Sequence, residues 1–145
     1  MSRAFLTRMA IVGVAAAATL VLAACGDTAR DVAVARSGVA RFHQQLDAAK
    51  YDEIYNEATP EFRNAAKRDE FLAFAQAVHR KLGTVKDATQ TRFFVNWTTS
   101  GTRVVLDYST KFDAGDAAEQ FTWKIAGNNA ALVGYNINST ALIVK

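Results

Sequence analysis

The chain is poor in the residues that build disulfides, metal sites and nucleophilic centres. It has one cysteine, Cys25, so no disulfide can form within it. Its two histidines, His43 and His79, have no second histidine, no cysteine and no paired acid at ligand spacing, which argues against a bound metal. No phosphate-binding glycine loop and no Gly-x-Ser-x-Gly nucleophile elbow occur either. The sequence therefore offers no catalytic residue, no metal site and no cofactor-binding motif.

Long apolar runs are also scarce, and the one that exists lies at the N-terminus. Arg3 and Arg8 precede MAIVGVAAAATLVLAA, the 16 residues from Met9 to Ala24. A basic segment followed by an apolar one is typical of a secretory signal. A permanent membrane-spanning helix is the alternative, but it needs roughly 20 apolar residues. We therefore favour the signal.

The apolar run ends in Leu-Ala-Ala-Cys-Gly, which resembles the lipobox of bacterial lipoproteins. The resemblance implies that diacylglycerol is attached to the sulfur of Cys25, that residues 1–24 are removed and that the new amine is acylated. Two or three acyl chains hold a protein on a bilayer, whereas one chain binds only marginally. Gly26 after the cysteine fits the outer membrane better than the inner one. We expect a protein of the bacterial cell envelope, anchored by covalent lipid and facing the periplasm.

The chain has almost no net charge once the signal is removed. Loss of residues 1–24 leaves 121 residues and takes Arg3 and Arg8 with it, so the formal net charge falls from +3 to +1. A nucleic-acid-binding protein needs a clustered basic face, and we expect no nucleic-acid partner. The length suits one domain. The expected organisation is a signal peptide over 1–24, a lipidated tether over 25–30 and a single domain over 31–145.

Helical periodicity fills the first half of the mature chain. Apolar residues from Val32 to Ala49 recur in steps of three and four, which predicts an amphipathic helix over 31–50. Thr59 is a typical N-cap before the only proline, and Gly83 suits a left-handed helix end. Three further helices are expected over 52–58, from Pro60 to about 66, and over 69–82.

After Lys86 the apolar period changes to two, which is typical of strands. Turns at Ser100-Gly101, 113–116 and 127–129 have hairpin spacing and predict a four-stranded antiparallel meander. Helices followed by a meander indicate an α+β fold, with N-terminal helices packed on one face of a curved sheet and preceded by a signal-peptide helix. The expected apolar face of the sheet carries Phe93, Val95, Trp97, Val104, Leu106, Tyr108, Phe121, Trp123, Ile125, Val133, Tyr135 and Ile137.

The stretch KFDAGDAAEQFTWKIAGNNAALVGYNI, with this order of elements, resembles small cone-shaped domains of the nuclear-transport-factor-two-like kind. It is similar in particular to an uncharacterised group of such domains in exported bacterial lipoproteins. Phe112, Gly115, Glu119 and the pair Gly134-Tyr135 carry the resemblance, which covers about residues 35–139. The resemblance implies a cone-like fold. Such folds host enzymes, carriers and scaffolds, so no single function follows.

The acids and histidines are expected to lie away from the apolar face. Glu119 shares the parity of that face but falls at the start of its strand, so we predict no carboxylate within a strand there. Asp107 falls on the opposite face, where cross-strand ion pairs explain it. His43 lies beside the helical stripe rather than on it, and His79 follows a stripe residue. None of these residues is predicted to be catalytic.

Aromatic residues form the candidate binding site. Cone-like folds often leave their wide end open, and a cavity between helices and sheet would take an apolar ligand or a peptide of an envelope protein. Ordinary core packing is the alternative, because aromatic side chains dominate cores of this size. The residues expected to line such a cavity are Tyr51, Tyr55, Trp97, Tyr108, Trp123 and Tyr135.

We expect a lipid-anchored envelope protein with a non-catalytic domain that binds a ligand or a protein partner. The alternative is a periplasmic enzyme with a carboxylate and a tyrosine in the pocket. A deeply buried acid with a raised pKa beside Tyr108 or Tyr55, either Asp107 or Glu119, would favour the enzyme. A third interpretation is a structural spacer, which would have neither a cavity nor an exposed apolar patch.

Overall fold

The computed structural model describes residues 12–143, with side chains from residue 27 onward. The chain divides into two compact units, residues 1–30 and 31–145, and α1 (Val12–Asp47) runs through both. The predicted signal peptide and the predicted lipidation site at Cys25 lie outside the residues whose side chains are described. Among the described residues, no helix combines the length and the apolar character needed to cross a membrane.

The helices lie close to their predicted positions. They are α2 (Tyr51–Glu57), α3 (Pro60–Ala65) and α4 (Arg68–Leu82). Thr59 caps α3 as predicted, because its side-chain oxygen accepts a hydrogen bond from the amide of Phe62. The apolar stripe of α1 is buried as its periodicity predicts: Val32, Ala35, Val39, Phe42 and Leu46.

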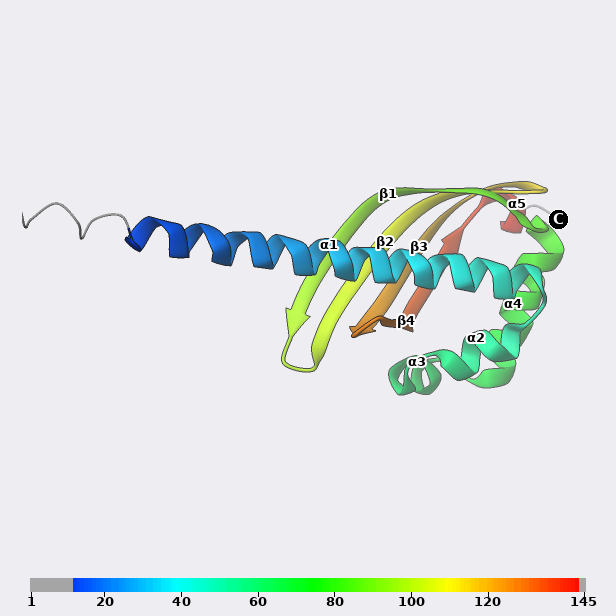
Figure 1. Cartoon of the computed structure of the whole chain (residues 1–145). Helices are drawn as coiled ribbons and strands as arrows, with labels where there is room; N and C mark the ends of the chain where they lie inside the picture. Colours follow the sequence, from blue (N-terminus) through cyan, green and yellow to red (C-terminus); the bar gives the residue numbers. More distant parts are fainter. Residues whose placement is uncertain (1–11, 144–145) are drawn as a thin grey trace, which may run out of the picture. The chain divides into compact units, whose positions relative to one another are not determined.

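The strands form the predicted antiparallel meander, so the fold is α+β. They are β1 (Val85–Thr98), β2 (Gly101–Phe112), β3 (Gly115–Ala126) and β4 (Asn129–Asn138), in the spatial order β1-β2-β3-β4. A one-turn helix that the sequence did not predict, α5 (Thr140–Ile143), follows. The sheet curves around the domain part of α1, and α2, α3 and α4 gather at one end of that helix (Figure 1).

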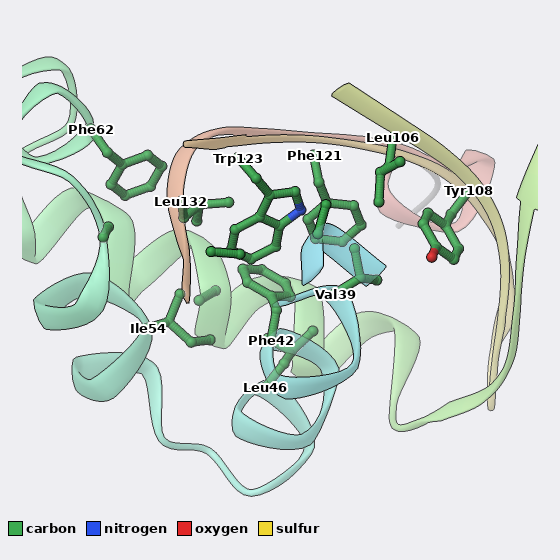
Figure 2. Packing of buried hydrophobic residues seen from close by; sticks show 14 of the residues in the cluster. Val39, Phe42, Leu46, Ile54, Phe62, Leu106, Tyr108, Phe121, Trp123 and Leu132 are labelled. Carbon is green, nitrogen blue, oxygen red and sulfur yellow. The ribbon is translucent and has the colours of Figure 1, made fainter. Parts of the chain in front are cut away.

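The core forms where α1 crosses the sheet. Val39, Phe42 and Leu46 face Phe121 and Trp123 of β3 (Figure 2). The rings of Phe42 and Phe121 meet edge to face with centroids 5.1 Å apart, and those of Phe121 and Trp123 stack at 6.0 Å. Aromatic pairs of this geometry stabilise a core beyond the area they bury.

Gly38 lets α1 approach this core closely. A Cβ at that position would lie 3.1 Å from the Trp123 ring and 3.1 Å from the Cβ of Ala130. Gly38 therefore allows close packing of the helix on Trp123 of β3 and Ala130 of β4.

One prediction about the apolar face of the sheet is wrong, and two residues of that face are left uncovered. A register irregularity opposite Thr122 and Trp123 places Leu132 in the core, 3% exposed, instead of Val133. One extra residue in a strand turns the following side chains to the other face. Phe93 and Trp97 are exposed, at 51% and 61%, on β1, which lies at the edge of the sheet.

The β2–β3 turn is fixed to the end of α4. One carboxylate oxygen of Asp113 accepts hydrogen bonds from the amide and hydroxyl of Thr84, and the other lies 2.7 Å from the Nζ of Lys86. Gly83, which precedes Thr84, has φ 77° and ψ −152°. This backbone conformation is essentially restricted to glycine, and a Cβ there would collide with Asp113.

Substitution Gly83→Ala is expected to lower the free energy of unfolding by about 1–3 kcal/mol, because alanine strains this backbone conformation. Urea unfolding of the two proteins measures the difference. An unchanged midpoint with an unchanged slope would contradict the role assigned to Gly83.

Asp113 is expected to stabilise the turn in a pH-dependent way. The side-chain contact with Lys86, followed by the hydrogen bonds from Thr84, lowers the pKa of Asp113 from 3.8 to about 2. A carboxyl with a lowered pKa contributes stability that is present above its unfolded-state pKa and is lost as the pH falls through the folded-state pKa. The stability difference between the wild type and Asp113→Asn should therefore shrink from about pH 4 to about pH 2 in urea unfolding. A constant difference would contradict this.

Candidate functional site

Glu119 is a fully buried carboxylate on the core face of the sheet. It is the fifth residue of β3, which starts at Gly115, and it is 2% exposed. The prediction that no carboxylate lies within a strand on this face is therefore wrong. The strand continues four residues before Glu119 because the β2–β3 hairpin is tight, with Phe112 paired to Gly115.

Three side chains donate hydrogen bonds to Glu119. The Oε2 atom lies 2.8 Å from Nε2 of His43 and 2.6 Å from the hydroxyl of Thr110, and Oε1 lies 2.6 Å from the hydroxyl of Tyr135. A buried charge is tolerated only when it is paired and hydrogen-bonded, and an ionised carboxylate only accepts. These four residues, His43, Thr110, Glu119 and Tyr135, form what we call the Glu119 network.

The network depends on α1 for one of its members. His43 is 7% exposed, and its ring meets Phe121 edge to face at 5.7 Å. The prediction that His43 lies beside the buried stripe is wrong. His43 follows Val39 by four residues and precedes Leu46 by three, and an apolar helix stripe is wide enough to include such a position.

The tyrosines near Glu119 stay protonated. Burial, then the Glu119 charge, then the hydrogen bond to Glu119 raise the pKa of Tyr135 well above the ordinary 10. Burial is also the main cause that raises the pKa of Tyr108, with Glu119 adding to it and Arg36 opposing it. Tyr108 and Glu119 are direct cross-strand partners. The phenol of Tyr135 therefore acts as a hydrogen-bond donor over the physiological pH range.

An apolar pocket of about 210 Å³ opens beside the network. Tyr135 links the two, because its ring lines the pocket and its hydroxyl binds Glu119. The ring of Phe74 meets that of Tyr135 edge to face at 6.2 Å, and Phe62 meets Phe71 at 5.3 Å. The pocket is lined by Phe62, Ala66, Glu70, Phe71, Phe74 and Tyr135.

The structure disperses the six predicted pocket residues. Of these, only Tyr135 lines the apolar pocket. Tyr55 is buried, and its hydroxyl donates to the carbonyls of Arg63 and Ala66. Tyr51 is partly buried with its hydroxyl 2.8 Å from Nδ1 of His79, and burial raises the pKa of Tyr51.

The other predicted pocket residues lie in the core or at the surface. Trp123 is 2% exposed, and within the described part of the chain its indole N–H has no acceptor. Tyr108 lies in the core but borders a second hollow of about 520 Å³. Trp97 is exposed on β1. The aromatic set therefore does not enclose a common cavity.

Asp107 lies where the sequence placed it, on the face opposite Glu119. Its carboxylate is 2.6 Å from Nε of Arg92, its cross-strand partner, and 2.9 Å from the amide nitrogen of Gln120. The hydrogen bond from Gln120 is the first cause that lowers the pKa of Asp107, and the Arg92 contact adds to it. An ion pair on the outer face accounts for this residue. Over residues 27–143, no three potential metal ligands cluster.

A family model described as a protein of unknown function, DUF4019, matches residues 39–135. No curated protein matches the chain. Among solved structures, the chain is similar to the solution structure of a SEC-C motif containing protein from Rhodopseudomonas palustris. The identity is 16% and the TM-score 0.48, over 72% of this chain and 75% of that chain. No functional information follows from this structural similarity.

Substitution Tyr135→Phe is expected to lower the free energy of unfolding by about 1.5–3 kcal/mol, because it removes a hydrogen bond to a charged group. Tyr51→Phe is the matched control, since it removes a tyrosine hydrogen bond that involves no carboxylate, and an ordinary hydrogen bond is worth about 0.5–1.5 kcal/mol. Urea unfolding at neutral pH measures both. Equal costs would contradict the stronger hydrogen bond assigned to Tyr135 in the Glu119 network.

Proposed function

The chain belongs to the DUF4019 family of proteins of unknown function, and we propose that it is a lipid-anchored bacterial envelope protein whose domain binds a small apolar ligand. In this proposal the domain is not catalytic. The observation that carries the proposal is the aromatic pocket of about 210 Å³ between α3, α4 and β4. A spacer would need no such pocket.

The pocket suits a ligand of about one ring or a short acyl segment. A dry apolar cavity of about 150 Å³ holds benzene, and ligand sites for larger molecules start near about 300 Å³. The walls are aromatic, whereas the exposed carboxylate of Glu70 is the one charge among the lining residues. Glu70 would disfavour an anionic head group, so the preferred ligand is neutral or cationic. An apolar side chain of a partner protein would satisfy the same pocket.

The Glu119 network supports binding rather than catalysis. A general base must present a free lone pair to the substrate proton within hydrogen-bond reach. The Glu119 side chain has no exposed surface, and three protein donors already occupy its oxygens. Glu119 therefore orients Tyr135, which lines the pocket.

The enzyme remains the second candidate because one observation favours it. Glu119 is deeply buried beside Tyr108 and Tyr135, as a carboxylate and tyrosine site requires. Incubation of the protein with a periplasmic extract, followed by mass spectrometry of small molecules, separates the two functions. A compound consumed by the wild type but not by Tyr135→Phe would favour the enzyme, whereas a compound retained unchanged favours the binding protein.

Lipid anchoring and the fold resemblance complete the proposal. The LAAC stretch after a basic and apolar segment supports lipidation at Cys25 and location in the envelope, with Gly26 favouring the outer membrane. The curved sheet around α1 (Figure 1) supports the resemblance to nuclear-transport-factor-two-like cone domains. Tethering raises the effective concentration of the domain at the membrane, which suits an accessory protein.

Substitution Ala66→Phe is expected to fill the pocket and weaken binding of the neutral probe N-phenyl-1-naphthylamine by about tenfold or more. Ala66 lines the pocket, whereas Ala65, its neighbour, is exposed and is not among the lining residues. Ala65→Phe is therefore the matched control and should bind as the wild type does. Fluorescence titration measures both. Equal affinity of the two variants would place the ligand elsewhere.

Substitution Cys25→Ser is expected to abolish incorporation of labelled fatty acid and to release the protein from the membrane fraction, because lipid transfer requires a thiolate. Gly26→Ala keeps the thiol and should remain labelled. Metabolic labelling and cell fractionation measure both. A labelled Cys25→Ser protein would show that the anchor lies elsewhere.

A further inference from the structure

Three large aromatic side chains are exposed together on β1. Phe93, Phe94 and Trp97 have exposed fractions of 51%, 63% and 61%. We call them the β1 aromatic patch. Exposed apolar clusters of this kind mark interaction sites, and β1 is an edge strand whose outer side pairs with no other described strand.

The patch occupies both faces of the edge strand. Phe93 and Trp97 share one face, and Phe94 points to the other, since side chains alternate along a strand. A partner sheet or helix packed on one face would leave the other face exposed. An added strand would pair with the backbone edge and leave both faces exposed. A fluid apolar phase, by contrast, surrounds both faces of a strand that enters it by its edge, so it covers all three side chains.

The patch lies at the end of the domain where α1 enters it. The Nε of Arg36 is 2.6 Å from Oε1 of Gln90, and the amide of Val85 is 3.1 Å from Oδ1 of Asp47. Arg36 and Asp47 are 11 residues apart on the helix, and Gln90 and Val85 are 5 residues apart on the strand, which is about 16 Å in each case. The chain number rises along the helix while it falls along the strand, so β1 runs antiparallel to the domain part of α1, as Figure 1 shows. Beyond Gln90 the strand therefore continues toward the N-terminal end of that helix.

The length of the tether keeps this end near the anchor. Asp31 begins the domain unit, and Cys25 precedes it by six residues. Six residues span at most about 21 Å even when fully extended. The attachment point of the acyl chains therefore stays within about 21 Å of the end of the domain that carries the patch.

The tip of the hairpin that carries the patch has no charged residue. Residues 93–102 read FFVNWTTSGT, and the flanking Arg92 and Arg103 pair with the carboxylates of Asp107 and Glu61. Lys124 is the cross-strand partner of Arg103. Aromatic rings prefer the headgroup level of a bilayer, and anionic headgroups attract basic side chains near the surface.

We propose that the β1 aromatic patch docks onto the lipid bilayer that holds the acyl chains of Cys25. The proposal rests on the lipid anchoring proposed above. Docking orients the domain on the membrane, with Trp97 and the two phenylalanines at the headgroup boundary.

Quenching of Trp97 fluorescence by brominated lipids tests the docking. Native acylated protein is reconstituted into vesicles of phosphatidylethanolamine and phosphatidylglycerol with brominated acyl chains. Trp97 and the buried Trp123 are the only tryptophans, so the difference between the wild type and Trp97→Phe isolates the Trp97 emission. We expect loss of most of that emission with brominated lipid and none with the unbrominated lipid. Phe93→Ser with Phe94→Ser should restore it, whereas Ile143→Ser, a change at another exposed apolar residue, should not.

The outcomes separate the docking from the anchor. Vesicle flotation reports the anchor alone. Flotation without quenching of Trp97 would overturn the docking and leave the anchor intact. Failure of the native protein to float would refute the anchor and the docking with it. A blue shift of Trp97 emission that depends on protein concentration in detergent, but not on bromine, would assign the patch to a second copy of the chain and overturn the lipid as its occupant.

Discussion

The packing of α1 against the concave face of the sheet is the constraint on which the rest of the domain depends. One stripe of this helix supplies Phe42 to the aromatic core and His43 to Glu119. The contact is close because Gly38 has no side chain to hold the helix away from Trp123. Without the helix, the carboxylate of Glu119 would lose its hydrogen bond to His43 and its cover from solvent.

The Glu119 network shows how a buried acid can serve a structure instead of a reaction. Its two oxygens accept hydrogen bonds from side chains of α1, β2 and β4, three separate elements of the chain. The network therefore fixes the relative positions of helix and sheet. Tyr135 is the least buried member of the network and also lines the apolar pocket, so the hydrogen bond to Glu119 links the network to the binding surface.

The domain offers two apolar surfaces of different character. The pocket between α3, α4 and β4 is a concave site with aromatic walls, suited to one small ligand. The β1 aromatic patch is a projecting edge with apolar side chains on both faces, suited to a phase without a fixed shape. In our proposals the two surfaces have different roles. The pocket binds one ligand, and the β1 aromatic patch orients the domain on the membrane.

The sequence by itself determined the local structure. Periods of 3.6 and 2 predicted the helices and the meander, and Thr59 and Gly83 predicted a cap and a helix end, because these signals act over one turn of chain. The LAAC stretch predicts lipidation of Cys25 from neighbouring residues in the same way, and this stays a prediction. Only the tertiary structure decided that His43 meets Glu119 across 76 residues, that an irregularity in β3–β4 pairing buries Leu132 instead of Val133, and that the end of β1 stays uncovered. Alternation states which residues share a face. It does not state how long each strand is, where its register slips or which part of a face a helix covers, because those depend on contacts between segments distant in the chain.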